Sequence, residues 1–210
     1  GDAGAILAGD LASGYAQDAL LAAPLPAERV VRAARGYAHL QEEVVSGQLA
    51  EMQATPSGTP GRAPAPTVET IHAPKTASYS VTGPLAVGAL LAGANDATAA
   101  RLGSFGRPLG IAFQLRDDLL GVFGDPSATG KPVCSDIRQG KRTALVAEMR
   151  GDAAADALLA RVLGRTDASD AEVEEVVRAM ESSGARARVE ARVAELVAEA
   201  RRALDGLGLA

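Results

Sequence analysis

The sequence predicts an all-α protein, and three observations support this prediction. All eleven prolines lie at or before Pro132, and the 78 residues after it (133–210) are rich in Ala, Glu, Arg, Val and Leu, a composition typical of helices. Apolar residues recur at spacings of three and four along most of the chain. No stretch alternates apolar and polar residues between turn signals, as a half-buried strand would.

Two helices are expected before the first long loop. Leu7, Leu11 and Tyr15 recur at spacing four in a segment that stops before Pro24. The second helix carries a longer stripe, made of Val30, Ala34, Tyr37, Ala38, Gln41, Val45, Gln48 and Met52. Residues 55–66 then hold four prolines and two glycines, so a loop is predicted there.

The helices after this loop are delimited by capping residues and prolines. Thr67 can cap the next helix, in which Pro74 predicts a kink because proline lacks an N–H and clashes with the preceding turn. Pro84 suits the first turn of a further helix that runs through Leu91. Asn95 marks the junction that follows.

The next helix is expected from Ala97 to about Val122, and two stripes run along it. The predicted core stripe is Leu102, Phe105, Leu109, Ala112, Phe113, Arg116 and Leu120. The polar stripe beside it is Arg107, Gly110, Gln114, Asp117 and Gly121, with Asp118 adjacent. Carboxylates near a helix C-terminus are repelled by the helix dipole, so a positive partner is expected there.

The rest of the chain is predicted as one loop and four helices. The loop covers Gly124 to Gly140, with Pro126, Gly130 and Pro132 in it. The predicted helices are Lys141 to Arg150, Asp152 to Leu163, Asp170 to Ser182, and Ala185 to about Leu204. Without an internal repeat or a composition break, residues 1–210 are expected to form a single helical domain.

Composition excludes several classes of protein. Hydrophobic residues at 47% and charged residues at 22% exclude a disordered chain. A net charge of -5 and 3% aromatic residues argue against a nucleic-acid partner. The longest apolar run, Pro84 to Ala94, is too short to span a bilayer, so no integral membrane segment and a cytoplasmic location are expected. The chain begins at Gly1 without an initiator Met, so upstream residues are expected to be missing.

Only three of the 21 basic residues are lysines: Lys75, Lys131 and Lys141. Each stands next to Gly or Thr. A lysine ammonium is a compact point charge that binds phosphate oxygens where a planar guanidinium would not fit. The alternative explanation is that biased codon usage favours arginine and that the three lysines remain by chance.

Asp117 and Asp118 are candidate magnesium ligands. An acidic pair on a helix is usually a solvated face, but here Gln114 lies one turn earlier and a Gly-rich loop with two lysines follows. Mg²⁺ prefers carboxylates and sites shared with substrate phosphates. The pattern therefore indicates a magnesium–diphosphate pocket.

The order of these motifs resembles the trans-isoprenyl diphosphate synthases, the polyprenyl synthetase family. The residues that carry the resemblance are Ala8-Gly9-Asp10, Gly47-Gln48, Lys75-Thr76, the run from Phe113 to Asp125, Gly130-Lys131-Pro132, Ser135-Asp136 and Gly140-Lys141-Arg142-Thr143. The ordered set is specific, although each piece alone is not.

The resemblance implies a helical bundle with a deep central cavity, usually a homodimer, that joins isopentenyl diphosphate to an allylic diphosphate with Mg²⁺ as cofactor. It implies that Asp117 binds the metal with Asp118 beside it. It also implies that Lys75, Lys131 and Lys141 hold the allylic diphosphate, while Thr76 and Gln114 line the cation site. Thr76 and Gln114 are expected to contact the diphosphate as well.

Two departures from the family pattern are visible. The second aspartate-rich motif, Asp-Asp-x-x-Asp, has Gly121 at its last position, and Asp125 follows four residues later. The first aspartate-rich motif belongs upstream of this chain, so the chain as given is expected to be inactive alone. Alternatives are a non-catalytic, diphosphate-binding partner subunit of a heteromeric prenyl synthase and a related helical terpene cyclase, which would show an Asn-Ser-Glu type motif. Product length cannot be predicted.

Overall fold

The computed structural model describes residues 2–54, 73–125, 127 and 133–208, and helices make up most of these ranges. Their bounds are α1 Asp2–Leu21, α2 Ala27–Ala54, the π-helix η1 Ala73–Thr82, α4 Gly83–Ala92, α5 Asp96–Phe123, α7 Ser135–Arg138, α8 Ala144–Met149, α9 Ala153–Val162, α10 Asp170–Ser182 and α11 Ala185–Asp205. The described ranges contain no strand, and the all-α prediction is confirmed.

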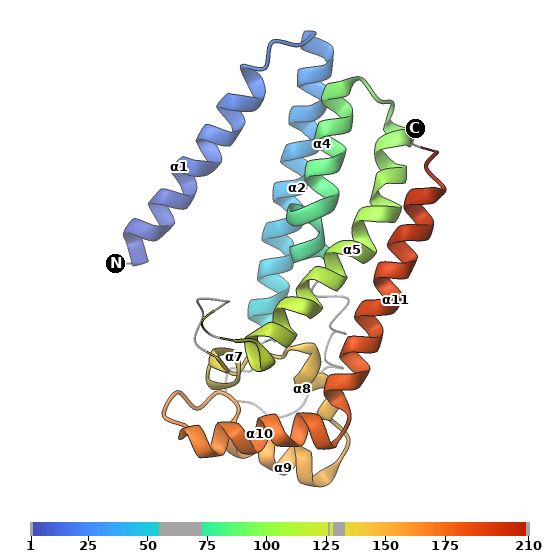
Figure 1. Cartoon of the computed structure of the whole chain (residues 1–210). Coiled ribbons are helices and arrows are strands. Elements are labelled where there is room, and N and C mark those ends of the chain that lie inside the picture. Colours follow the sequence, from blue (N-terminus) through green and yellow to red (C-terminus); the bar gives the residue numbers. More distant parts are fainter. Residues whose placement is uncertain (1, 55–72, 126, 128–132, 209–210) are drawn as a thin grey trace.

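Helices α2, α4, α5 and α11 lie side by side, and α7 to α10 gather at one end of them (Figure 1). Within the described ranges no helix is long and apolar enough to cross a membrane. The predicted loop at 55–66 and the predicted cap Thr67 lie outside the described residues.

Helix α1 stands apart from this bundle, on the side of α2 (Figure 1). The amide Nε2 of Gln41 on α2 donates to the Ser13 hydroxyl at 2.7 Å. The apolar stripe that predicted this helix faces solvent, with Leu7 67% and Tyr15 66% exposed. Helix α1 therefore presents an apolar face that the other described residues do not cover.

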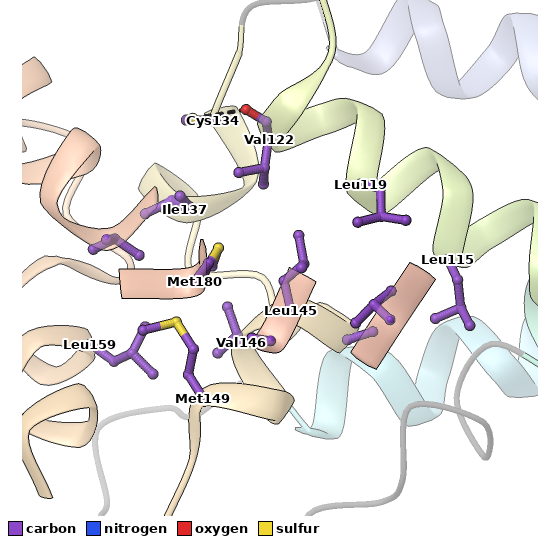
Figure 2. Packing of buried hydrophobic residues seen from close by; sticks show 14 of the residues in the cluster. Leu115, Leu119, Val122, Cys134, Ile137, Leu145, Val146, Met149, Leu159 and Met180 are labelled. Carbon is purple, nitrogen blue, oxygen red and sulfur yellow. Dashed lines mark hydrogen bonds between the residues drawn. The ribbon is translucent and has the colours of Figure 1, made fainter. Parts of the chain in front are cut away.

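The main core lies where the second half of α5 meets α7 to α11 (Figure 2). Leu145, Leu159 and Met180 are almost completely buried there. On α11, Val189, Leu196 and Ala200 are buried, whereas Leu204 near the end of the helix is 40% exposed.

On α5 the predicted core stripe is confirmed at Ala112 and was wrong at Phe113, Arg116 and Leu120. Phe113 is 60% and Leu120 38% exposed, and Arg116 is exposed too. The large apolar residues of the buried face are Ile111, Leu115, Leu119 and Val122, which lie there together with Ala112. Both flanks of this helix are apolar and both fit a period of 3.6, so only the packing against α11 and η1 decides which flank is buried.

The predicted starts of α4 and α5 are confirmed. Pro84 lies in the first turn of α4, and the Asn95 side chain caps α5 by accepting from the Thr98 N–H at 2.8 Å. The predicted helix from Lys141 begins only at Ala144, because the Thr143 side chain caps it there. The predicted loop at 124–140 contains the short helix α7.

Candidate functional site

Two glycines of α5 allow η1 to pack closely against it. A Cβ added to Gly110 would lie 2.4 Å from the Cα of Ala77, and one added to Gly106 would lie 3.2 Å from the Cα of Thr82. Residue numbers rise along η1 while they fall along α5, so the two helices run antiparallel. The close approach is possible only without side chains at these two positions of α5.

This packing places the predicted Lys75–Thr76 pair beside the second half of α5. Both residues belong to η1 and precede Ala77. In the antiparallel arrangement they therefore lie at the level of the α5 turn after Gly110, which carries Gln114. A π-helix inserted at such a position is a frequent feature of functional sites.

Asp118 is buried at the end of this site, with 4% of its surface exposed. Its Oδ1 accepts from Nε2 of Gln114 at 2.9 Å, and its Oδ2 accepts from the backbone N–H of Ala144 at 3.3 Å. Burial raises the pKa of Asp118 to about 6, against the lowering effect of these two hydrogen bonds, and the neighbouring Asp136 and Asp117 carboxylates raise it further.

A third carboxylate, Asp136 at the start of α7, lies beside Gly121. A Cβ added to Gly121 would be 3.5 Å from Oδ2 of Asp136. The Nζ of Lys141 donates to Oδ1 of Asp136 at 2.6 Å. The structure thus brings a carboxylate close to Gly121, which stands at the last position of the Asp-Asp-x-x-Asp pattern. Asp136 was not predicted as a site residue, although it belongs to the Ser135-Asp136 motif and stands five residues before Lys141.

Asp125, which follows the motif, lies in a local turn. Its Oδ1 accepts from the backbone N–H and the hydroxyl of Ser127 at 2.8 and 2.7 Å. These two hydrogen bonds hold the pKa of Asp125 below its usual value. Asp136 is therefore the carboxylate that adjoins Gly121. Lys131 lies outside the described residues.

The segment that carries Lys141 also contacts the loop after α9. Gly140 and Gly164 both have left-handed backbone angles, with φ of 74° and 84°, and a Cβ on Gly140 would lie 3.0 Å from the Cα of Gly164. The N–H of Gly164 donates to the Ile137 carbonyl at 2.9 Å. Arg138 also donates to Asp170 at 2.6 Å.

The donor set suits magnesium shared with phosphate oxygens. No three His, Cys, Asp or Glu side chains in the described ranges are grouped as a self-sufficient metal site. Mg²⁺ needs only one or two carboxylates when waters and phosphates complete its shell. Asp117, which is partly exposed beside the buried Asp118, offers such a hard oxygen ligand.

The fold and site define an all-α protein with several acidic residues and Lys141 at one end of its bundle. The model of the family described as Polyprenyl synthetase matches residues 1–180, and the chain belongs to this family. Enzymes of this family are generally magnesium-dependent.

Curated and solved relatives agree with this assignment. The (2E,6E)-farnesyl diphosphate synthase of Mycobacterium tuberculosis is 36% identical over 192 residues, which are 89% of this chain and 52% of that protein. The geranylgeranyl pyrophosphate synthase of Corynebacterium glutamicum, solved with isoprenyl diphosphate and magnesium, has a TM-score of 0.84 at 35% identity and covers 95% of this chain and 56% of that one.

A polyprenyl synthetase structure from Streptomyces coelicolor has a TM-score of 0.83 at 29% identity, with 99% of this chain and 62% of that chain covered. The chain thus spans about half the length of the first curated relative that it matches.

Proposed function

We propose that this chain forms the part of a prenyltransferase that binds magnesium and the allylic diphosphate. The whole protein would condense isopentenyl diphosphate with an allylic diphosphate to make a longer trans-prenyl diphosphate. The observation that carries this proposal is the antiparallel packing of η1 on α5. It supports a single site that combines Lys75 and Thr76 with Gln114 and the carboxylates that follow.

In this proposal the pair Asp117 and Asp118 forms the acidic side of the metal site. Asp117 is partly exposed and can reach a hydrated ion. When bound, Mg²⁺ would neutralise charge on the diphosphate leaving group. Lys75, Lys131 and Lys141 would hold diphosphate oxygens as point charges. Release of Lys141 from Asp136 is the step that would free its ammonium for this role.

Gln114 and Thr76 would stabilise positive charge on the allylic carbon. A side-chain amide oxygen and backbone carbonyls of a π-helix are dipoles that can face a carbocation without reacting with it. The Nε2 of Gln114 is held by Asp118 at 2.9 Å, so its Oε1 is directed away from Asp118. The amide is therefore pre-oriented before substrate binds.

Isothermal titration of the 210-residue chain with inorganic pyrophosphate, with and without Mg²⁺, tests this proposal. We expect binding that requires Mg²⁺ and that weakens at least about tenfold in Asp117→Ala, because that variant loses the exposed carboxylate. The proposal would be contradicted if wild-type protein did not bind pyrophosphate at millimolar concentration in the presence of Mg²⁺. If the whole protein also binds pyrophosphate but does not turn over isopentenyl diphosphate, the non-catalytic partner subunit is favoured instead.

A homodimer is the proposed assembly. The uncovered apolar stripe of α1, with Ile6, Leu7, Leu11 and Tyr15 exposed, supports a second copy at this face. Light scattering after size-exclusion chromatography should give twice 21.3 kDa, and Leu11→Glu should shift the mass towards the monomer. The cytoplasmic location and the central cavity stay predictions.

A further inference from the structure

The two oxygens of Asp118 connect two different segments of the chain. Oδ1 is bound within α5, to Gln114 one turn earlier. Oδ2 is bound to the backbone N–H of Ala144, which is 26 residues further along the sequence. Burial of a charge is costly unless such hydrogen bonds are made.

Ala144 is the first residue of α8, and Lys141 lies three residues before it. The first N–H groups of a helix have no partner within the helix, so they depend on caps. Thr143 is itself buried, and its hydroxyl accepts from the Val146 N–H at 3.4 Å. Asp118 and Thr143 together satisfy the start of α8 and thereby define where the preceding residues lie.

Direct metal binding by Asp118 is hard to reconcile with its surroundings. Mg²⁺ dehydrates reluctantly and keeps several waters, which need space around the carboxylate. Asp118 is 4% exposed, and both of its oxygens already accept hydrogen bonds. Its neighbour Asp117 is partly exposed on the same turn of α5.

We propose that Asp118 is a positioning residue that fixes the start of α8, and through it Lys141, and does not itself ligate the metal. The role of Lys141 in diphosphate binding rests on the proposed function above. The two adjacent aspartates thus have different roles. Asp117 would bind the ion, whereas Asp118 connects α5 to the segment that carries Lys141.

Two substitutions at one position separate positioning from metal binding. Asp118→Asn keeps an acceptor for the Ala144 N–H, and the Gln114 amide can rotate to accept from the new NH₂ group. Asp118→Ala removes the acceptor. A carboxylate that ligates Mg²⁺ would be lost in both variants, whereas a positioning acceptor is lost only in the second.

The matched control is Asp152→Ala. The Asp152 side chain accepts from the Ala155 N–H at 2.9 Å at the start of α9, which is the same kind of contact at a different helix. This control loses a helix cap of similar strength away from the lysine-bearing segment.

Hydrogen exchange and titration with Mg²⁺ and inorganic pyrophosphate are both measured on the full chain. In Asp118→Ala we expect exchange of residues 141–146 to become about tenfold faster and pyrophosphate affinity to fall about tenfold, the value of one lost hydrogen bond. Asp118→Asn should retain the wild-type exchange and an affinity within about threefold. Asp152→Ala should leave the affinity unchanged.

Equal loss of affinity in the Asn and Ala variants would overturn the proposal in favour of metal binding. Unchanged exchange of residues 141–146 in Asp118→Ala would also overturn it, because the anchor would then not exist. If wild-type protein binds no pyrophosphate, the proposed function fails, and the exchange experiment still decides whether Asp118 fixes this segment.

Discussion

Replacing Asp118 by Asn should stabilise the protein at neutral pH. The carboxylate has a pKa of about 6 in the folded chain against 3.8 as its ordinary value, mainly because burial penalises the charged form. A change of one in pKa corresponds to about 1.4 kcal/mol, so the ionised group costs roughly 3 kcal/mol of the free energy of unfolding. Asn carries no charge and avoids this cost.

The sign of the pH dependence follows from proton binding. Between about pH 4 and pH 6 the native state binds more protons at Asp118 than the unfolded state does, so this group lowers stability as pH rises. Below this window both states are protonated and the cost is absent. The stability gain of Asp118→Asn should therefore be near zero at about pH 4 and reach its full value above about pH 6.5.

Neutral hydrogen bonds to Gln114 and Ala144 are weaker than those of a carboxylate, so a net gain of about 1–3 kcal/mol is expected. For a chain of this size that gain corresponds to a rise in Tm of roughly 2–12 °C. Urea denaturation at pH 7.5 and pH 4.5, followed by circular dichroism, measures the free energy directly.

The control is Asp152→Asn, which should change stability little at pH 7.5, since Asn and Asp are equally good N-cap residues. A destabilised Asp118→Asn variant at pH 7.5 would refute the reasoning. So would a gain of the same size at both pH values, because the charge would then not be its cause.

Three other substitutions give independent tests. Gly110→Ala should destabilise the fold by about 3 kcal/mol, since its Cβ would meet the Ala77 backbone, whereas Gly88→Ala meets nothing and should be neutral or stabilising in the same urea titration. Cys134→Val should cost about 2 kcal/mol by thermal denaturation, because a β-branched residue suits φ of 62° poorly, and an unchanged Tm would argue against strain there. Lys131→Ala should weaken pyrophosphate binding in titration calorimetry, and wild-type affinity would remove this lysine from the site.

The helices were predictable from sequence because their signals are local. Pro84, Asn95 and Gly164 act on their own neighbours, through a missing N–H, a capping oxygen and a left-handed backbone angle. The predicted start of α8 was three residues too early, because Lys141 and Arg142 have helix propensities as favourable as those of the residues inside α8. Only the cap at Thr143 and its packing decide the boundary.

Which flank of α5 is buried could not be predicted in the same way. Phe113 and Leu115 are both apolar, yet one is exposed and the other lies in the core. The choice depends on Gly106 and Gly110, which let η1 approach one flank to backbone contact. Glycines were visible in the sequence, but their partner segment was not, because contacts between distant segments leave no periodic signal.

The two carboxylates near the C-terminal end of α5 need groups that offset their negative charge, and the structure shows such groups for Asp118. A helix end with a negative dipole disfavours two adjacent aspartates. The fold compensates Asp118 with a backbone N–H from the start of α8 and with the Gln114 amide. Asp117, partly exposed on the same turn, lies where a cation from solution can reach it. Asp118 thus connects α5 to the start of α8, and Asp117 supplies a partly exposed negative charge beside it.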